Sequence, residues 1–366
     1  MRLNTGEADG NVIAAVDAPT VEDGSGVLHI LLLTVGPIVL ALVISGALLL
    51  ILGVNPLTYY AVVLERGLFT SLGLEQSITR MGPLLLVAAG LIVAFRAGIW
   101  NLGVDGQFLL GAVLAAASAP ALAHTLPPAL VLLASAILAA IVGAAWSLLP
   151  ALLRAYHGVN EIITSLMMTF LGTSLANVLV KLMFLDPATT VPQTRTLPVD
   201  DRLPRLFGTT INAGLLIGLL AIVGVQIMMA HTAFGLKLRT VGANPLAAAH
   251  AGLPVAWLTV LVFALSAGLI GLAGAVEVLG IQGNVRADWN PAYGLAVIPL
   301  VFLARLNGYA AIAFVFFFSV LSIGGESAAR RVGVPTFFTL VLIALIMIIL
   351  ATVEYADQRA RAGRAS

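Results

Sequence analysis

The chain contains no cysteine, and charged residues make up only 10% of its 366 residues. The lack of cysteine excludes disulfide bonds and thiolate metal sites. The low charge excludes an ordinary soluble domain, because such domains carry about 25% charged residues. A net charge of +1 argues against a nucleic-acid partner. The remaining composition is 60% hydrophobic with a mean hydropathy of +1.07, which indicates that lipid is the main solvent.

Sequence signatures of enzymes are also missing. The chain has no GxxxxGK[ST] phosphate-binding loop, no HExxH zinc motif and no GxSxG nucleophile turn. Its histidines are scattered without the spacing of metal ligands. They are His29, His124, His157, His231 and His250. The sequence therefore predicts no catalytic residue, no metal site and no cofactor on this chain.

Long segments without charge are the main positive signal. Asp, Glu, Lys and Arg are absent between Asp23 and Glu65, between Asp105 and Arg154, and between Arg239 and Glu277. A membrane-spanning helix needs roughly 20 apolar residues, so each of these segments holds at least one span. The sequence predicts an all-α polytopic membrane protein.

The apolar segments predict about ten spans, with ends uncertain by a few residues. They are placed at residues 28–53, 79–97, 100–122, 129–153, 161–184, 211–230, 255–280, 291–304, 307–325 and 335–354. The second and eighth spans are expected to be short, as the interrupted helices of transporters are. The first 26 residues, with five acidic residues and one arginine, predict a disordered tail rather than a signal peptide.

Positive charge does not settle the orientation of these spans. They divide the 18 cations equally between the two sides of the membrane, so the positive-inside rule gives no answer. In this division Arg80, at the outer end of the second span, is counted on the side opposite the N-terminus. An even number of spans only places both ends of the chain on the same side.

Two similar short strings suggest an internal repeat. RAGIWN (residues 96–101) follows the second span and RADWN (residues 286–290) follows the seventh, and the predicted spans place them on opposite membrane faces. Such a placement is what an inverted repeat requires. Either spans two to five and seven to ten are related halves, or the similarity of the strings is a coincidence.

Polar residues enter the apolar region in the stretch AFRAGIWNLGVDGQFLLGA (residues 94–112). Asn101, Asp105 and Gln107 are costly in lipid, so they should face protein or a watery path. One hypothesis makes them part of a solute path or gate. The other is that they only satisfy the end of a broken helix.

Two further carboxylates are candidates for the solute path. Asn160 and Glu161 open the predicted span at 161–184, where the helix dipole favours a carboxylate. On this helix Glu161, Ser165, Met168, Gly172 and Ala176 share one face, suited to helix packing or to lining a cavity. The small residues of Ser266–Gly280 predict a helix that packs closely against others. Glu277 stands near the end of this helix, where it either pairs with a residue such as Arg286 or meets a solute.

The loop at residues 231–254 has the signals of a defined structure. It carries Lys237 and Arg239, and Asn244 can cap a short alanine-rich helix with Pro245 in its first position. The sequence Gly252-Leu253-Pro254 ends that helix. Such a capped helix suits a docking surface, although a passive connector remains the alternative.

Five stretches, taken in order, resemble a known family. They are FRAGIWNLGVDGQFLLGA, GVNEIITSLMM, GLKLRTVGANPLAAAHAGL, SAGLIGLAGAVEVLG and RRVGVP. Over about residues 28–354 the chain resembles the permease subunits of ATP-binding cassette (ABC) importers in the branched-chain amino acid, ribose and nucleoside group. It is most similar to the nucleoside type, and the specificity of the match lies in the ordered set.

The resemblance implies a set of domains and partners. A permease domain at 27–354 would lie between cytoplasmic tails at 1–26 and 355–366 in a prokaryotic cell membrane. The loop at 231–254 would dock on a separate ATPase that binds ATP and Mg²⁺. Within this loop Lys237, Arg239, Gly242, Asn244 and Ala248 are the expected coupling residues. No glutamate opens the alanine run, which departs from the EAA loop of other importers.

The resemblance also implies a second permease subunit and an extracytoplasmic binding protein that delivers the solute. The second subunit is expected to be a different, related chain, with a second copy of this chain as the alternative. The solute would be a nucleoside, with a simple sugar as the alternative. A competing hypothesis is a secondary transporter that couples to an ion gradient through Asp105, Glu161 and Glu277. All three carboxylates lie near predicted span ends, whereas coupling-ion sites lie near the midplane, so the sequence favours the ABC permease.

Overall fold

The protein is mostly helical in the residues that its computed structural model describes, which are 39–206, 208–335, 338–346, 348–349 and 352–353. Extended backbone pairs there only as isolated bridges, between Gln193 and Arg286 and between Arg205 and Asn212. The prediction of an all-α protein is confirmed. The tails predicted at 1–26 and 355–366 lie outside the described residues.

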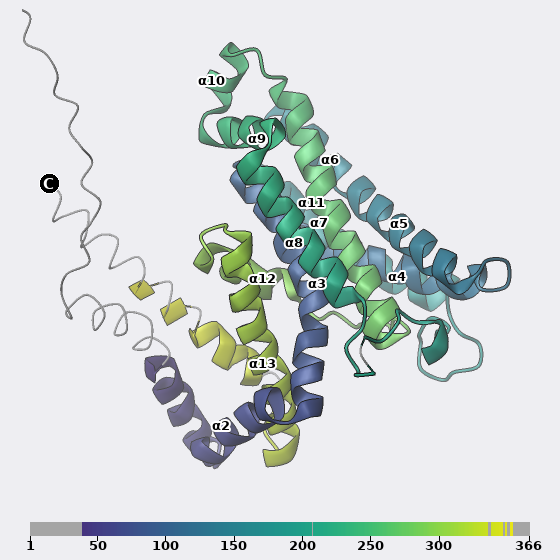
Figure 1. Cartoon of the computed structure of the whole chain (residues 1–366), viewed down its shortest axis with the longest axis vertical. Helices are drawn as coiled ribbons and strands as arrows, with labels where there is room; N and C mark the ends of the chain where they lie inside the picture. Colours follow the sequence, from purple (N-terminus) through teal and green to yellow (C-terminus); the bar gives the residue numbers. More distant parts are fainter. Residues whose placement is uncertain (1–38, 207, 336–337, 347, 350–351, 354–366) are drawn as a thin grey trace, which may run out of the picture.

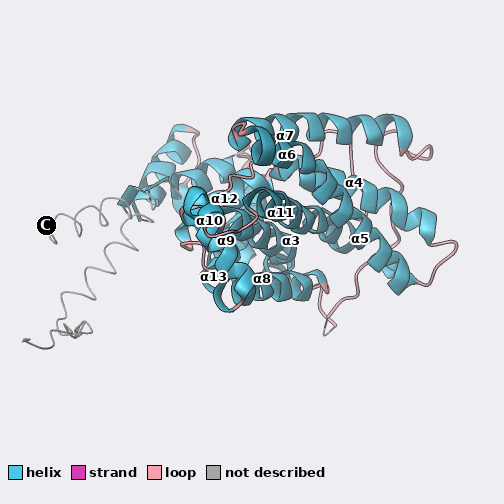
Figure 2. Ribbon diagram, turned by 90° about the horizontal axis from the view of Figure 1, so that it is seen from above, coloured by secondary structure: helices cyan, strands magenta, loops and turns pink. Residues whose placement is uncertain are grey.

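Helices of very different length follow one another along the chain (Figures 1 and 2). They are Val39–Ile51, α2 (Pro56–Leu64), α3 (Ser71–Arg96), α4 (Val104–Leu122), α5 (Pro128–Trp146), α6 (Leu148–His157), α7 (Glu161–Val178), α8 (Gly214–His231), α9 (Ala233–Ala243), α10 (Pro245–His250), α11 (Val255–Glu277), α12 (Tyr293–Leu303) and α13 (Gly308–Val332). Residues 338–346 are also helical. Single π-helical turns, Glu65–Phe69, Leu179–Met183 and Val278–Gln282, extend α2, α7 and α11.

Seven helical segments among the described residues are long and apolar enough to cross a membrane. Val39–Ile51 and α12 are shorter apolar helices. The finding supports a polytopic membrane protein, while the number of ten spans stays a prediction.

Helices α3 and α11 form the centre of the bundle. Side chains of α3 from Leu84 to Ala94 are buried, and α11 packs on α3, α4 and α5. The backbone of α4 at Phe108 approaches Gly274 of α11 so closely that a Cβ atom would not fit between them. The predicted close packing of Ser266–Gly280 is confirmed. By contrast, α5 and α7 expose most of their apolar surface, which lipid or a second subunit can cover.

The predicted limits of several spans were wrong. The second span is not short, because α3 begins at Ser71, where the Thr70 hydroxyl accepts a hydrogen bond from the Gly73 amide. Arg80 therefore lies well inside this helix and not at its outer end. The third span begins at Val104, four residues later than predicted, and α2 was not predicted. The eighth span is short as predicted, because α12 has 11 residues.

The two ends of the bundle carry different structures (Figure 1). At one end, which we call the α9–α10 end, α9 lies against the turn at Gly98 that follows α3. At the other end, the loop end, the segment after α7 pairs with the segment after α11, where the Thr194 amide donates to the Val285 carbonyl over 2.9 Å. Arg96 and Arg286 thus lie at opposite ends, as an inverted repeat requires, and the repeat itself stays a prediction.

Candidate functional site

An arginine lies within the helical bundle and is paired with a glutamate. Arg80 of α3 places Nη1 2.8 Å from Glu326 Oε1 of α13, and it also donates to the Ser322 hydroxyl over 3.0 Å. Both charged side chains are partly exposed, 19% for Arg80 and 34% for Glu326. Charged groups inside a membrane helix bundle pair with each other or face a watery cavity. Arg80 and Glu326 pair with each other and also line cavities.

A second carboxylate lies close by on α11. Glu277 is 1% exposed, and its two oxygens accept hydrogen bonds from the Tyr293 hydroxyl over 3.2 Å and from the Gln282 amide over 3.1 Å. Gln282 reaches Glu277 because a π-helical turn follows α11 and ends at Gly283, whose φ of +78° suits glycine. Arg286, the partner considered from the sequence, is not among these contacts.

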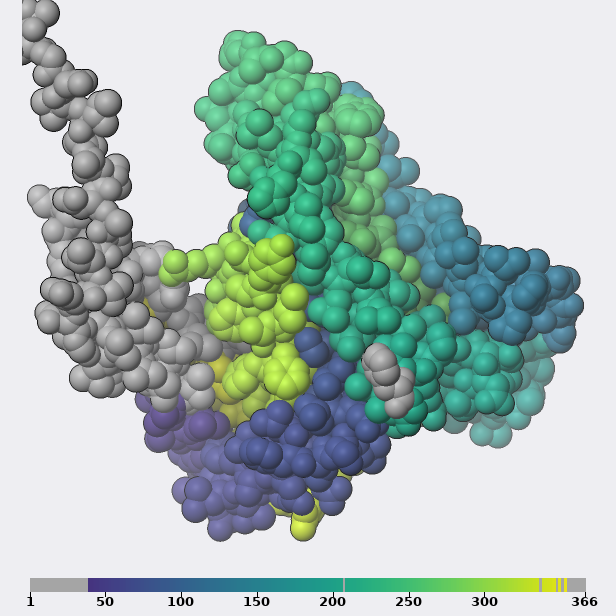
Figure 3. Space-filling view, viewed as in Figure 1, coloured from purple at the N-terminus to yellow at the C-terminus, as the bar shows by residue number. Residues whose placement is uncertain are grey.

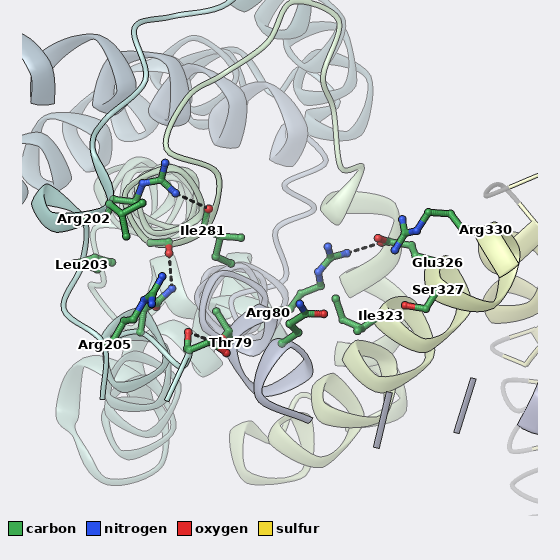
Figure 4. Close-up of a pocket in the computed structure, with 15 residues that line it drawn as sticks. Thr79, Arg80, Arg202, Leu203, Arg205, Ile281, Ile323, Glu326, Ser327 and Arg330 are labelled. Atoms are coloured by element: carbon green, nitrogen blue, oxygen red, sulfur yellow. Dashed lines mark hydrogen bonds and ion pairs between the residues drawn. The ribbon is translucent and has the colours of Figure 1, made fainter. Parts of the chain in front are cut away.

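Two cavities meet at the Arg80–Glu326 pair. One, the loop-side cavity, has a volume of about 350 Å³ and continues to Arg202 and Arg205 (Figure 4). The other, the helix-side cavity, has a volume of about 370 Å³ and is lined by Glu277 together with aromatic side chains. Those aromatic residues are Trp289, Tyr293 and Phe318. Arg80, Glu326 and Arg330 line both cavities, so the ion pair stands between two polar spaces.

Arginines are concentrated in the loop-side cavity. Arg202 donates to the carbonyls of Leu197 over 3.0 Å and Ile281 over 3.2 Å, which ties the two loops at the loop end together. In Figure 4 the Arg80 side chain extends toward Glu326 and Arg330, and Arg202 and Arg205 approach from the other side. The entrance on the side of the loops is therefore positively charged.

The polar residues after α3 form a closed network. Asn101 is fully buried and exchanges two hydrogen bonds with Gln107, over 3.1 and 2.9 Å. Its amide also donates to the Ser266 hydroxyl of α11 over 3.1 Å, and its carbonyl oxygen accepts from the Gly103 amide over 3.1 Å. Neither Asn101 nor Gln107 lines the two cavities at Arg80. Their place in a solute path stays a prediction.

Asp105 joins two helices at their first turns. It lies in the first turn of α4, and its Oδ1 atom accepts a hydrogen bond of 2.8 Å from the backbone amide of Gly294, in the first turn of α12. A carboxylate at a helix N-terminus satisfies an otherwise free backbone donor and is favoured by the helix dipole. Gly294 follows Tyr293, which holds Glu277, so Asp105 supports one wall of the helix-side cavity.

The predicted carboxylate of α7 lies away from these cavities. Asn160 caps α7 by accepting from the Ile162 amide over 2.9 Å, and Glu161 forms an ion pair of 3.3 Å with Arg154. The predicted face of α7 is confirmed, because Glu161, Ser165, Met168, Gly172 and Ala176 are its buried residues. The Ser165 hydroxyl accepts a hydrogen bond of 3.1 Å from the Leu102 amide, so this face packs on the segment before α4.

The loop at residues 231–254 folds into two helices. The Asn244 side chain accepts from the Ala247 amide over 3.0 Å and Pro245 opens α10, so the predicted cap is confirmed. The preceding helix α9 was not predicted, and Thr232 caps it in the same way. Lys237, Arg239 and Asn244 are exposed, whereas Ala248 is buried. In Figure 3 α9 and α10 project from one end of the molecule, as a docking surface must.

Helix α9 contacts the end of α3 at a pair of glycines. A Cβ atom on Gly242 would lie 2.5 Å from the Arg96 carbonyl, and one on Gly98 would lie 3.0 Å from Gly242. Gly98 also has a φ of +70°, which non-glycine residues rarely adopt. Arg96 adds a hydrogen bond of 3.0 Å to the Leu306 carbonyl at the other end of α12. The projecting helices thus rest directly on the segment that leads to Asn101 and Asp105.

The Arg80–Glu326 ion pair was not predicted, because the predicted second span begins next to Arg80 and leaves that residue at its outer end. A signal for it exists in the sequence: Gln76, Thr79 and Arg80 fall on one face of a helix by their spacing, and all three line the loop-side cavity. Glu326 and Arg330, four residues apart, form a matching face on α13. Within the described residues, no group of His, Asp and Glu is arranged to hold a metal ion.

Comparisons with known proteins agree with this architecture. A family model described as "Branched-chain amino acid transport system / permease component" matches residues 73–351. The glucose ABC transporter permease protein TsgB13 of Haloferax volcanii is 34% identical over 328 residues, covering 86% of this chain and 85% of its own length. The nucleoside permease NupB of Lactococcus lactis is 27% identical over 351 residues, covering 90% and 93%.

A third relative, the guanosine ABC transporter permease protein NupP of Bacillus subtilis, is 28% identical over 336 residues and covers 86% of this chain and 91% of its own. The alternative of an ion-driven secondary transporter loses its basis, since these relatives are permeases of ABC systems. The matched residues run from the first turn of α3 past the end of α13, and they therefore include the ion pair and the projecting helices. The chain belongs to the family of permease components of branched-chain amino acid type transport systems, and it is the membrane subunit of an ABC importer.

Proposed function

We propose that this permease imports an uncharged nucleoside or simple sugar into a prokaryotic cell, along a path that includes the two cavities at Arg80. The observation that carries this proposal is the partly buried ion pair between two polar cavities in an otherwise apolar bundle. An ion pair in this place is costly unless it borders a watery space. Relatives whose names state glucose, nucleoside or guanosine supply the class of solute.

The transport complex needs further subunits. In the proposal a separate ATPase binds and hydrolyses ATP with Mg²⁺, and a second, related but different permease chain completes the path. A binding protein delivers the solute onto the loops at 186–210 and 281–290. Both tails then lie in the cytoplasm, on the side of α9 and α10. Support comes from the exposed, doubly capped α9–α10 segment at one end and the arginine-lined cavity at the other.

The contacts suggest how docking of the ATPase reaches the path. A displacement of α9 acts through Gly242 on the turn at Gly98, because their backbones are in contact. The turn leads to α4, whose Asp105 is bonded to the start of α12. Tyr293, at that start, holds Glu277 in the helix-side cavity. Closure of the ATPase would therefore change the position of α12 relative to α11, where the cavity is formed.

The experiment that tests this proposal is purification of the tagged protein from its native membrane in mild detergent, followed by mass spectrometry and uptake in proteoliposomes. We expect an ATP-binding subunit and one second permease chain to co-purify, with uptake of tritiated uridine or glucose that requires ATP. Recovery of this chain alone, with uptake driven by an imposed ion gradient, would overturn the proposal. Recovery of two identical permease copies would overturn only the pairing.

A further inference from the structure

Arg80 and Glu326 stand where the loop-side and helix-side cavities meet. Each cavity, at about 350 and 370 Å³, falls within the range of about 300–1,000 Å³ that small-molecule sites occupy. The two side chains come from different helices, α3 and α13, and the Ser322 hydroxyl bridges them by contacting both. A solute that passes from one cavity to the other must pass this pair.

The pair keeps unused hydrogen-bonding capacity. Both hydrogen bonds of Arg80 leave from Nη1, and both contacts of Glu326 are made by Oε1. Among the described residues, no partner is recorded for Arg80 Nη2 and Nε or for Glu326 Oε2. In the same part of the chain every fully buried side-chain nitrogen or oxygen has a partner. These free atoms are therefore exposed to the cavities, where they offer donors beside an acceptor.

The balance of charge selects against ionic solutes at this point. The helix-side cavity is lined by two cations, Arg80 and Arg330, and two carboxylates, Glu277 and Glu326. A solute of either charge would therefore lie close to like charges, either the two carboxylates or the two guanidinium groups, and such repulsion is strong in a low-dielectric environment. A hydroxyl group, in contrast, donates to Oε2 and accepts from Nη2 without breaking the pair.

From this arrangement we propose that Arg80 and Glu326 bind two adjacent hydroxyl groups of an uncharged solute as it crosses the permease. The aromatic lining of the helix-side cavity offers an apolar surface to the ring that carries the hydroxyls. Ribose and hexoses share this vicinal diol. The inference rests on the proposed function, because it assumes that the solute passes these cavities, and it adds the group that the permease recognises.

The experiment compares hydroxylated and deoxygenated solutes in proteoliposomes that contain the complete transporter. Uptake of tritiated uridine is measured against 2′-deoxyuridine, and uptake of glucose against 2-deoxyglucose, for the wild type and for Glu326→Gln. The binding protein is the same in every assay, so its own preference cancels when the ratio for the variant is divided by the ratio for the wild type. The remaining change reports on the permease.

We expect Glu326→Gln to lower the preference for the hydroxylated solute by about tenfold, since a hydrogen bond to a charged group is lost. Arg80→Lys keeps the charge that pairs with Glu326 but loses the planar fork of donors, and the same ratio should fall. This second variant remains informative if Glu326→Gln does not fold. Glu65→Gln is the matched control, because Glu65 is exposed, lies 3.8 Å from Arg331 and lines neither cavity at Arg80.

The outcomes separate this inference from the function on which it rests. If the wild type imports neither uridine nor glucose but does import leucine with ATP, the proposed solute class is wrong. If it imports uridine or glucose, and both variants reduce uptake while their preference ratios equal that of the wild type, the solute class stands. In that case Arg80 and Glu326 do not bind the diol.

Discussion

Two polar regions of the bundle differ in whether their side chains keep hydrogen-bond donors and acceptors without a partner. The region after α3 contains Asn101, whose two amide hydrogens and carbonyl oxygen are all engaged by Gln107, Ser266 and Gly103. The region around Arg80 is also polar but only partly buried, and its guanidinium and its partner carboxylate keep atoms free toward two cavities. Polar residues within a membrane bundle are thus not equivalent.

The difference separates a structural network from a site that can bind a solute. A saturated network such as that of Asn101 fixes the backbone, because any movement would leave a buried polar group without a partner. An unsaturated pair can accept a solute without first losing a contact. By this criterion we expect the Asn101–Gln107 pair to hold the start of α4 in place and the Arg80–Glu326 pair to face the proposed solute path.

The largest effect should follow from removing the charge of Arg80. Arg80→Gln leaves Glu326 without its partner, and breaking such a pair costs about 3 kcal/mol or more, so uptake should fall by roughly 100-fold. The measurement is ATP-dependent uptake together with the melting temperature of the purified transporter. The double variant Arg80→Gln/Glu326→Gln should recover stability without recovering uptake. If the double variant recovered both stability and uptake, the Arg80–Glu326 pair would be structural, as the Asn101 network is, and the two regions would not differ in role.

An intermediate effect is expected where the two regions are joined. Asp105→Ala removes the acceptor of the Gly294 amide, and the loss of one charge-assisted hydrogen bond should reduce uptake about tenfold. Asp105→Asn keeps an acceptor at the same position and should retain most of the activity. Abundance in the membrane is measured by immunoblot for both. If abundance falls in step with uptake in the alanine variant, Asp105 is only structural.

The smallest effect should come from the docking segment. In Arg239→Ala/Asn244→Ala, loss of an exposed cation and of a helix cap worth about 1 kcal/mol should reduce uptake about fivefold. ATP hydrolysis by the complex should continue, and co-purification of the second permease should be unchanged. The comparison is the number of ATP molecules hydrolysed per solute imported. An unchanged ratio would contradict the assignment of α9 and α10 as the coupling segment.

The sequence predicted the helical class and the position of the capped helix α10, because both follow from local rules. Apolar segments of sufficient length identify membrane helices, and Asn244-Pro245 is a strong start signal. It also predicted the small-residue packing of α11. These features depend on neighbouring residues along the chain, so a single sequence is enough to reveal them.

The central ion pair could not be predicted in the same way. Arg80 and Glu326 are 246 positions apart, and only the packing of α3 on α13 brings them together. The charge of Arg80 placed the start of α3 about two turns too late, because a charge in an apolar segment normally marks its end. A partner on another helix removes that cost. For the same reason, the sequence singled out Asn101 and Asp105 but could not show which other helices they contact. Their partners, Ser266 on α11 and Gly294 on α12, are known only from the structure.

The central claim is that the solute passes the cavities at Arg80 and not the network at Asn101. The natural absence of cysteine allows a direct test, because a single introduced thiol is the only thiol on this chain, and its labelling is read on this subunit after the subunits are separated. Ala296→Cys places it in the lining of the helix-side cavity, and Ser266→Cys places it in the saturated network. The measurement is the rate of labelling by a water-soluble thiol reagent with and without uridine or glucose. We expect labelling at position 296 that the transported solute slows, and none at position 266. Labelling and protection at 266, with none at 296, would contradict the account.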